Sequence, residues 1–112
     1  MQFLKQAEQA GYKNYLYFVC TADPAINIKR VEQRVALGGH GVPTEKIISR
    51  YFASLQLLPE LLPHTHRTFL FDNSAENSEI NLIAEIVKDT TIYLQTQSIP
   101  WWVEKYVINP LF

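Results

Sequence analysis

The chain has 112 residues, 47% of them hydrophobic and 19% charged, which is enough for one hydrophobic core and too short to be expected to hold two. The formal net charge of −1 gives no overall field that would attract a polyanion, so we expect no nucleic-acid partner. The single cysteine excludes a disulfide within the chain, and we interpret Cys20 as a small core residue because it ends an apolar run.

Membrane targeting is not indicated either. Charged residues recur within the first eight positions, unlike in a signal peptide, and no later segment has the roughly twenty apolar residues that span a bilayer. We therefore expect a cytoplasmic protein without membrane contact.

The chain opens with a predicted helix and strand. Apolar residues at helical spacing predict a helix over 3–10, closed by Gly11. The run 15–20 is rich in aromatic residues and contains valine, which is typical of a strand buried on both faces. Asp23 as an N-cap and Pro24 at the first helical position mark where the next helix begins.

Two helices flanking a glycine-rich turn are expected next. The first runs over 24–37 and the turn over 38–43, which holds three of the four glycines. Thr44 is expected to cap the second helix, which apolar spacing carries to about residue 58, with weakening at Pro59 or Pro63.

The second half of the chain is expected to add further strands to the sheet. We predict a buried strand over 68–71, a helix over 78–89 and a final strand over 91–95. A short aromatic helix that contains Trp101 and Trp102 is expected to begin at Pro100. Strands that alternate with helices favour a single α/β domain with a small parallel sheet and flanking helices.

Candidate chemistry gathers at the turn between the two helices. Arg30 and Arg34 are four residues apart, so both guanidinium groups can reach toward one side of the helix and bind phosphate oxygens. The glycines that follow allow backbone N–H groups to converge on an anion, or the joint between the helices to bend. The alternative is a solvated helix face that ends in an ordinary C-cap.

The roles of several further polar residues stay open on residue chemistry alone. His40 suits a phosphate contact or a structural role in the turn better than general-base work. Arg50 lies on the polar side of its helix, where it is either a surface residue or a third group around the same anion. His64 and His66 lack metal-ligand spacing and are expected in an exposed linker. The cluster 72–74 closes a strand, where α/β sheets gather ligand groups, or it forms only a turn.

A nucleotide cradle is missing from the sequence. A P-loop needs Gly, four residues and then Gly-Lys-Ser/Thr, and none of the four glycines here is followed by lysine. The segment 11–14 is no substitute.

The arginine-glycine segment resembles the zeta-toxin-like family of P-loop kinases, related to UDP-N-acetylglucosamine kinases of toxin–antitoxin systems. Over roughly two thirds of the chain, the matching residues are Ala10-Gly11-Tyr12, Arg30-Val31-x-x-Arg34-Val35-x-x-Gly38-Gly39-His40-x-Val42-Pro43, Ile47-x-x-Arg50-Tyr51-x-x-Ser54-Leu55 and Leu70-Phe71-Asp72-Asn73-Ser74. The combined pattern is specific, although its separate pieces are weak.

The resemblance implies a partial P-loop kinase-like fold of one partial domain over 1–112. Residues 24–58 would form a helical LID, and 59–112 a strand and the carboxy-terminal helices. The LID implies Arg34 and Arg50 as phosphate contacts, with Arg30 and His40 in support. The family's Walker A loop and its acidic substrate-binding residue map nowhere here, so no catalytic residue and no metal ligand is assigned.

These observations lead to three hypotheses. The first is the LID-bearing carboxy-terminal part of an ATP-dependent small-molecule kinase, which would be inactive alone. ATP and Mg²⁺ would be used only when a Walker A-bearing chain or a second copy completes the enzyme. An antitoxin is a further expected partner. The second is a non-enzymatic binding or regulatory module derived from such a kinase. The third, and least favoured, is an independent small enzyme that uses His40 with Asp72.

Overall fold

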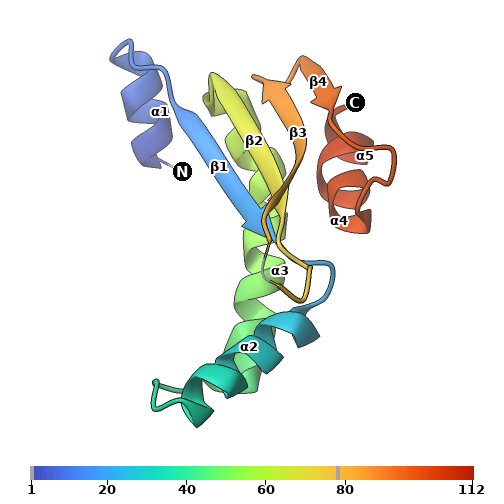
Figure 1. Cartoon of the computed structure of the whole chain (residues 1–112). Helices are drawn as coiled ribbons and strands as arrows, with labels where there is room; N and C mark the ends of the chain where they lie inside the picture. The colour runs from blue at the N-terminus through green and yellow to red at the C-terminus, as the bar shows by residue number, and fades with distance from the viewer. Residues whose placement is uncertain (1, 78) are drawn as a thin grey trace.

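The computed structural model describes residues 2–77 and 79–112. Helical and extended segments alternate along it in a mixed α/β order (Figure 1). In chain order they are α1 (Gln2–Gln9), β1 (Tyr15–Cys20), α2 (Pro24–Ala36), α3 (Thr44–Leu61), the 3₁₀ turn η1 (Leu62–His64), β2 (Arg67–Asp72), β3 (Asn81–Val87), β4 (Thr91–Leu94), α4 (Trp101–Val103), the π-helical turn η2 (Glu104–Ile108) and α5 (Asn109–Leu111).

The four strands form one sheet in the order β1-β2-β3-β4. Only β1 and β2 pair in parallel, joined by the crossover through α2 and α3, while β3 and β4 follow as antiparallel neighbours. The α/β class is therefore confirmed, but the expectation of a parallel sheet holds for one pair only. The two added strands are joined by short connections, which antiparallel pairing permits.

The predicted helix over 78–89 is wrong, because residues 81–87 form strand β3. Apolar residues three and four apart suggested a helix, yet Ile83 and Ala84 are neighbours in a strand and are both buried. The register shifts between Leu70 and Phe71 on the paired strand, an irregularity that breaks the two-residue alternation. Because of this irregularity, the buried residues of β3 are spaced along the sequence as they would be in a helix.

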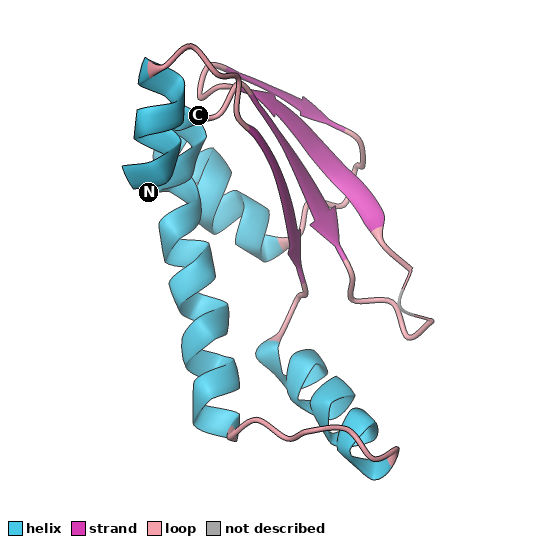
Figure 2. Ribbon diagram, turned by 90° about the vertical axis from the view of Figure 1, so that its left-hand side faces the viewer, coloured by secondary structure: helices cyan, strands magenta, loops and turns pink. Residues whose placement is uncertain are grey.

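α1, α3 and the carboxy-terminal helical turns lie on one face of the sheet, whereas α2 lies beyond its end (Figures 1 and 2). The core between the two layers combines the inner side of α3, the inward residues of the sheet and the carboxy-terminal helical turns. Its members are Cys20, Tyr51, Leu55, Leu58, Leu62, Leu70, Ile83, Ala84, Ile86, Trp102, Val103 and Val107. The interpretation of Cys20 as a core residue is confirmed.

The other face of the sheet is uncovered in the described structure (Figure 2). It carries Tyr15, Tyr17 and Val19 of β1, which are about half exposed or more, beside Phe69 and Phe71 of β2. The Tyr17 ring stacks on Phe69 with centroids 5.1 Å apart. An apolar sheet face is normally buried against a second layer.

The hairpin of α2 and α3 extends past the end of the sheet (Figures 1 and 2). α2 has no buried residue and packs on α3. The radius of gyration is 15.4 Å, whereas a compact domain of this length would have about 13 Å. The hairpin and the one-sided sheet account for this open shape.

Helix ends agree with the sequence at two of four positions and are displaced by one residue at the other two. The Asp23 carboxylate accepts a hydrogen bond from the Ala25 N–H at 2.8 Å, and Gly11 closes α1 with φ +89°. The aromatic helix begins at Trp101 with Pro100 as its N-cap, one residue later than expected. Thr44, however, is the first residue of α3 and not its cap, which is Pro43. α3 also runs through Pro59 to Leu61.

Candidate functional site: an arginine-lined cavity pair

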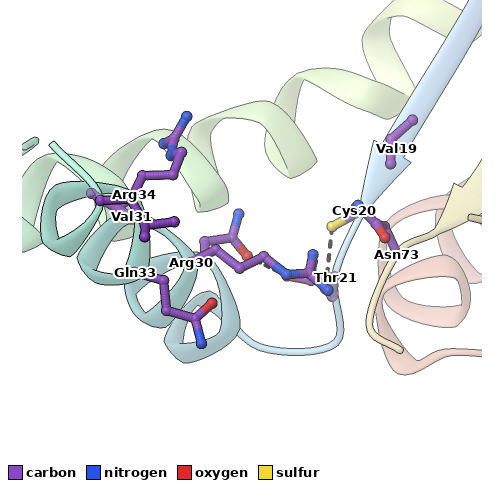
Figure 3. A pocket seen from close by; sticks show the side chains of 10 residues that line it. Val19, Cys20, Thr21, Arg30, Val31, Gln33, Arg34 and Asn73 are labelled. Carbon is purple, nitrogen blue, oxygen red and sulfur yellow. Dashed lines mark hydrogen bonds between the residues drawn. The ribbon is translucent and has the colours of Figure 1, made fainter. Parts of the chain in front are cut away.

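Two cavities open where β1 ends and the α2–α3 hairpin begins. The larger, of about 580 Å³, is lined by the end of β1, one side of α2 and Asn73 (Figure 3). The smaller, of about 340 Å³, is lined by the same strand end, α2 and α3. Arg34 lines both, while Arg30 lines the larger and Arg50 the smaller.

The strand end that forms the floor of both cavities is held by a small polar network. The Tyr51 hydroxyl on α3 donates to the Thr21 carbonyl oxygen at 2.6 Å. The Thr21 hydroxyl lies 2.5 Å from the Asn27 side-chain oxygen on α2. Because these contacts tie both hairpin helices to the residue after β1, the arginines are positioned relative to the sheet.

Arg34 and Arg50 are exposed cations without a carboxylate partner among the described residues. Arg30 differs, since its Nη2 donates to the Ala75 carbonyl oxygen at 3.0 Å. Figure 3 shows Arg30 reaching toward Thr21 while Arg34 points in another direction. Arg30 thus links α2 to the loop after β2, whereas Arg34 and Arg50 have free guanidinium groups for an anion.

The glycine turn is a helix C-cap, in agreement with the plainer of the two sequence interpretations. The Gly39 N–H donates to the Arg34 carbonyl at 2.7 Å and the Gly38 N–H to Val35 at 3.0 Å, the bonds of a Schellman motif. Gly38 has φ +94°. These two amides are therefore not free to bind an anion, and His40, in the same turn, lines neither cavity.

Two buried ionisable groups lie beneath the cavities. Desolvation by burial raises the pKa of the Cys20 thiol to about 11. Burial, followed by the neighbouring Cys20, also raises the pKa of Tyr51 well above its ordinary value. Both groups stay neutral at physiological pH, so the thiol is not an activated nucleophile.

Asn73 is a site residue that the sequence identified only as part of a turn. Its N–H donates to the Cys20 carbonyl at 2.8 Å, which places the side chain in the wall of the larger cavity. The Asn73 Oδ1 atom is buried without a hydrogen-bond partner. Its position directly after a buried strand was the available signal.

Asp72 holds the loop after β2 and the carboxy-terminal helix in place through two hydrogen bonds to its carboxylate. One carboxylate oxygen accepts from the buried Trp102 indole N–H at 3.0 Å and the other from the Ser74 N–H at 2.9 Å. Asp72 lines a separate cavity of about 570 Å³ on the β3 side, away from His40 in the hairpin turn. The arrangement gives no support to a His40–Asp72 pair.

His64 and His66 were expected in an exposed linker, and this expectation is wrong. His64 ends η1, where its Nδ1 lies 3.1 Å from the Glu8 carboxylate, and both His64 and His66 are half-buried. Within residues 2–77 and 79–112, no group of three or more His, Cys, Asp and Glu side chains is arranged to hold a metal ion. No helix in these ranges has the length and apolar character needed to cross a bilayer.

Comparison with known proteins adds no family assignment. A scan against family models found no match to the chain, and searches of curated proteins and of solved structures found none either. The zeta-toxin-like resemblance therefore stays a prediction.

Proposed function

We propose that the α2–α3 hairpin is a LID-like, phosphate-binding element of an ATP-dependent small-molecule kinase of the zeta-toxin-like type. In this proposal Arg34 and Arg50 contact the nucleotide phosphates, and Arg30 and Gly39 fix the shape of the hairpin. The observation that carries it is the position of Arg34, which lines both cavities at the carboxyl end of β1. In α/β sheets, ligands bind at the carboxyl ends of the strands.

The charges support this assignment. In the described structure neither Arg34 nor Arg50 is neutralised by an acidic side chain within ion-pair distance. Guanidinium groups bind phosphate oxygens through paired hydrogen bonds and stabilise the charge that spreads over a transferring phosphoryl group. An anion held between the two arginines would face the end of β1.

The remaining machinery has to come from a partner that carries a Walker A loop. The 112 residues contain no Gly-x-x-x-x-Gly-Lys-Ser/Thr motif. ATP with Mg²⁺ would supply the phosphoryl group and its neutralising cation once held by such a loop. This chain's own residues would bind and orient the phosphates and shield them from water.

Titration with inorganic tripolyphosphate, followed by NMR of the arginine side chains, tests the proposal on the chain alone. We expect weak, millimolar binding that shifts the Nε signals of Arg34 and Arg50 first. Arg34→Ala and Arg50→Ala should each weaken binding by about five- to ten-fold, the value of one charge-assisted contact. Lys46→Ala removes the same charge from exposed α3 outside both cavities, and should change the affinity less than two-fold.

Equal losses in all three variants would show a diffuse electrostatic effect and refute the proposal. Calorimetry with ATP–Mg²⁺ should give little or no heat, because the cradle is not on this chain. Micromolar ATP binding by the chain alone would contradict the need for a Walker A partner.

A non-enzymatic binding or regulatory module is the second candidate. The glycine amides favour it, since they are used within the hairpin cap and leave no backbone cradle there for a nucleotide. This candidate predicts that the chain folds stably and binds its ligand without a Walker A partner. The kinase proposal predicts that the same anion binding strengthens when that partner is added.

A further inference from the structure

A third cavity opens beside the arginine cavities, on the β3 side of the sheet. Its volume of about 570 Å³ lies within the range of about 300–1,000 Å³ that is usual for small-molecule sites. The lining comes from the segments after β1 and β2, the start of β3 and the segment between β4 and α4. Asp72 and Ser74 line this cavity, whereas Asn73 between them lines the larger arginine cavity. No residue is shared with either arginine cavity.

The charge of this cavity is opposite to that of the arginine cavities. In the described structure its lining contains one carboxylate, that of Asp72, and no lysine, arginine or histidine. The other polar side chains that line it are two amides and three hydroxyls, those of Asn81, Gln95, Ser74, Thr96 and Ser98. An anionic ligand would be repelled by Asp72 and would find no cation in the lining. A neutral or positively charged ligand is therefore favoured.

The Asp72 carboxylate has capacity for a further donor. Its two oxygens accept hydrogen bonds from the neutral Trp102 indole N–H at 3.0 Å and the Ser74 N–H at 2.9 Å. An ionised carboxylate can accept about four hydrogen bonds, so acceptor sites remain. Among the described residues no ion pair involves Asp72, which is half-buried. A ligand ammonium group would neutralise this charge and supply the missing donors.

The neutral part of the lining is suited to hydroxyl groups. The Ser74 hydroxyl accepts a hydrogen bond from the Ala22 N–H at 2.8 Å, so its own proton is available to donate. The Gln95 backbone N–H donates to the Ile83 carbonyl at 2.8 Å, which fixes the segment to β3 while the side chain stays exposed. Amides and hydroxyls both donate and accept, and a ligand hydroxyl does the same.

We propose that this cavity binds a small polyhydroxylated amine. Its ammonium group would lie against the Asp72 carboxylate, and its hydroxyls would bond to the side chains of Asn81, Gln95 and Ser98. The inference is independent of the proposed function, because the lining is separate from the arginine cavities. It adds a second ligand site, of opposite charge preference, at the same end of the sheet.

Three six-carbon probes that differ at one terminal group test the charge preference. At pH 7 glucamine carries an ammonium group, sorbitol is neutral and gluconate carries a carboxylate. Binding to the whole chain is followed at matched ionic strength by NMR of the Trp102 indole N–H, which donates to Asp72. We expect millimolar binding of glucamine, about five-fold weaker binding of sorbitol, the value of one partly exposed ion pair, and none of gluconate.

A pair of glutamine variants tests the location. Gln95→Ala removes a lining amide but keeps the backbone bond to Ile83, and should weaken glucamine binding by about two- to five-fold. Gln97→Ala removes the same group from an exposed position of the same segment outside the lining, and should change the affinity less than two-fold. Asp72→Asn should remove the preference for glucamine over sorbitol. If that variant does not fold, the glutamine pair and the three probes still decide.

Failure of glucamine to bind, or binding of sorbitol or gluconate as tight as that of glucamine, would overturn the inference. Equal losses in Gln95→Ala and Gln97→Ala would also overturn it. Glucamine should leave the side-chain signals of Arg34 and Arg50 unshifted, and shifts there without one at Trp102 would place the amine outside this cavity. Glucamine binding as expected, with no response to tripolyphosphate, would support the inference while the proposed function fails.

Discussion

The hydroxyl of Tyr51 on α3 donates a 2.6 Å hydrogen bond to the backbone carbonyl of Thr21, thirty residues earlier at the end of β1. Thr21 is 5% exposed, so its carbonyl has little access to water as an alternative partner. The bond fixes the base of the projecting hairpin to the sheet. It is therefore a link between the core and the arginines of the candidate site.

Tyr51→Phe should destabilise the fold by about 1–2 kcal/mol, because it leaves the buried Thr21 carbonyl with only the weaker Cys20 thiol as a donor. Urea unfolding followed by Trp fluorescence measures this loss. Tyr12→Phe is the matched control, since Tyr12 is 71% exposed and should change the stability by less than about 0.5 kcal/mol. Equal effects in the two variants would refute a specific role for the Tyr51 hydroxyl.

Gly39→Ala should destabilise the hairpin, whereas Gly41→Ala should not. A Cβ at Gly39 would lie 2.9 Å from the Arg34 backbone oxygen, and one at Gly41 would lie 3.4 Å from the Val35 Cγ2 atom, which can yield. We expect a cost of about 1–3 kcal/mol for Gly39→Ala. Amide exchange over residues 34–44 should accelerate in this variant alone.

Arg30→Ala should loosen the loop after β2 while leaving anion binding largely intact. The lost bond is the one from Arg30 Nη2 to the Ala75 carbonyl oxygen, so exchange at Ala75 and Glu76 should accelerate. Tripolyphosphate affinity should fall less than two-fold, in contrast to Arg34→Ala. Lys29→Ala, which removes a charge from the exposed side of the same helix, should alter neither quantity. A larger loss of affinity than in Arg34→Ala would assign the main phosphate contact to Arg30.

Stability should fall in alkaline solution because of Cys20. The unfolded chain loses the thiol proton near pH 9.0, whereas burial keeps it bound in the folded chain until about pH 11. Between these values the unfolded state binds fewer protons, so the free energy of unfolding decreases as the pH rises, by at most about 2–3 kcal/mol. Titration of Tyr51 also lowers the free energy of unfolding as the pH rises, since its pKa is raised in the folded chain as well.

Cys20→Ala should flatten this alkaline slope relative to the native chain. Urea titrations just below pH 9 and near pH 11 give the comparison. An unchanged slope would show that Cys20 does not control it.

Secondary structure was predictable wherever local chemistry and burial agreed. The strand over 15–20, the N-cap at Asp23 and the helix end at Gly11 each follow from residue types with one strong local preference. The strand at 81–87 was missed, because the strand irregularity opposite Ile83 and Ala84 depends on a pairing that no local pattern encodes.

The candidate site was predictable in part, for a similar reason. Arg34 and Arg50 were named from the sequence, and the crossover brings both to the end of β1. The role of Arg30 depends on Ala75, 45 positions away, and that of Asn73 on its bond to Cys20. Contacts between residues so far apart in the sequence depend on how the strands and helices are arranged in space. That arrangement could not be predicted from a single sequence.

The uncovered sheet face and edge mean that the stability of this chain depends on what it meets. Any molecule that binds the folded form there and not the unfolded form raises the free energy of unfolding by mass action, by about 2.7 kcal/mol at a hundred times its dissociation constant. The melting temperature should then rise with partner concentration. Without such a molecule a larger fraction of the chain would be unfolded and exposed to proteases, so its lifetime would depend on whether the face and the edge are covered.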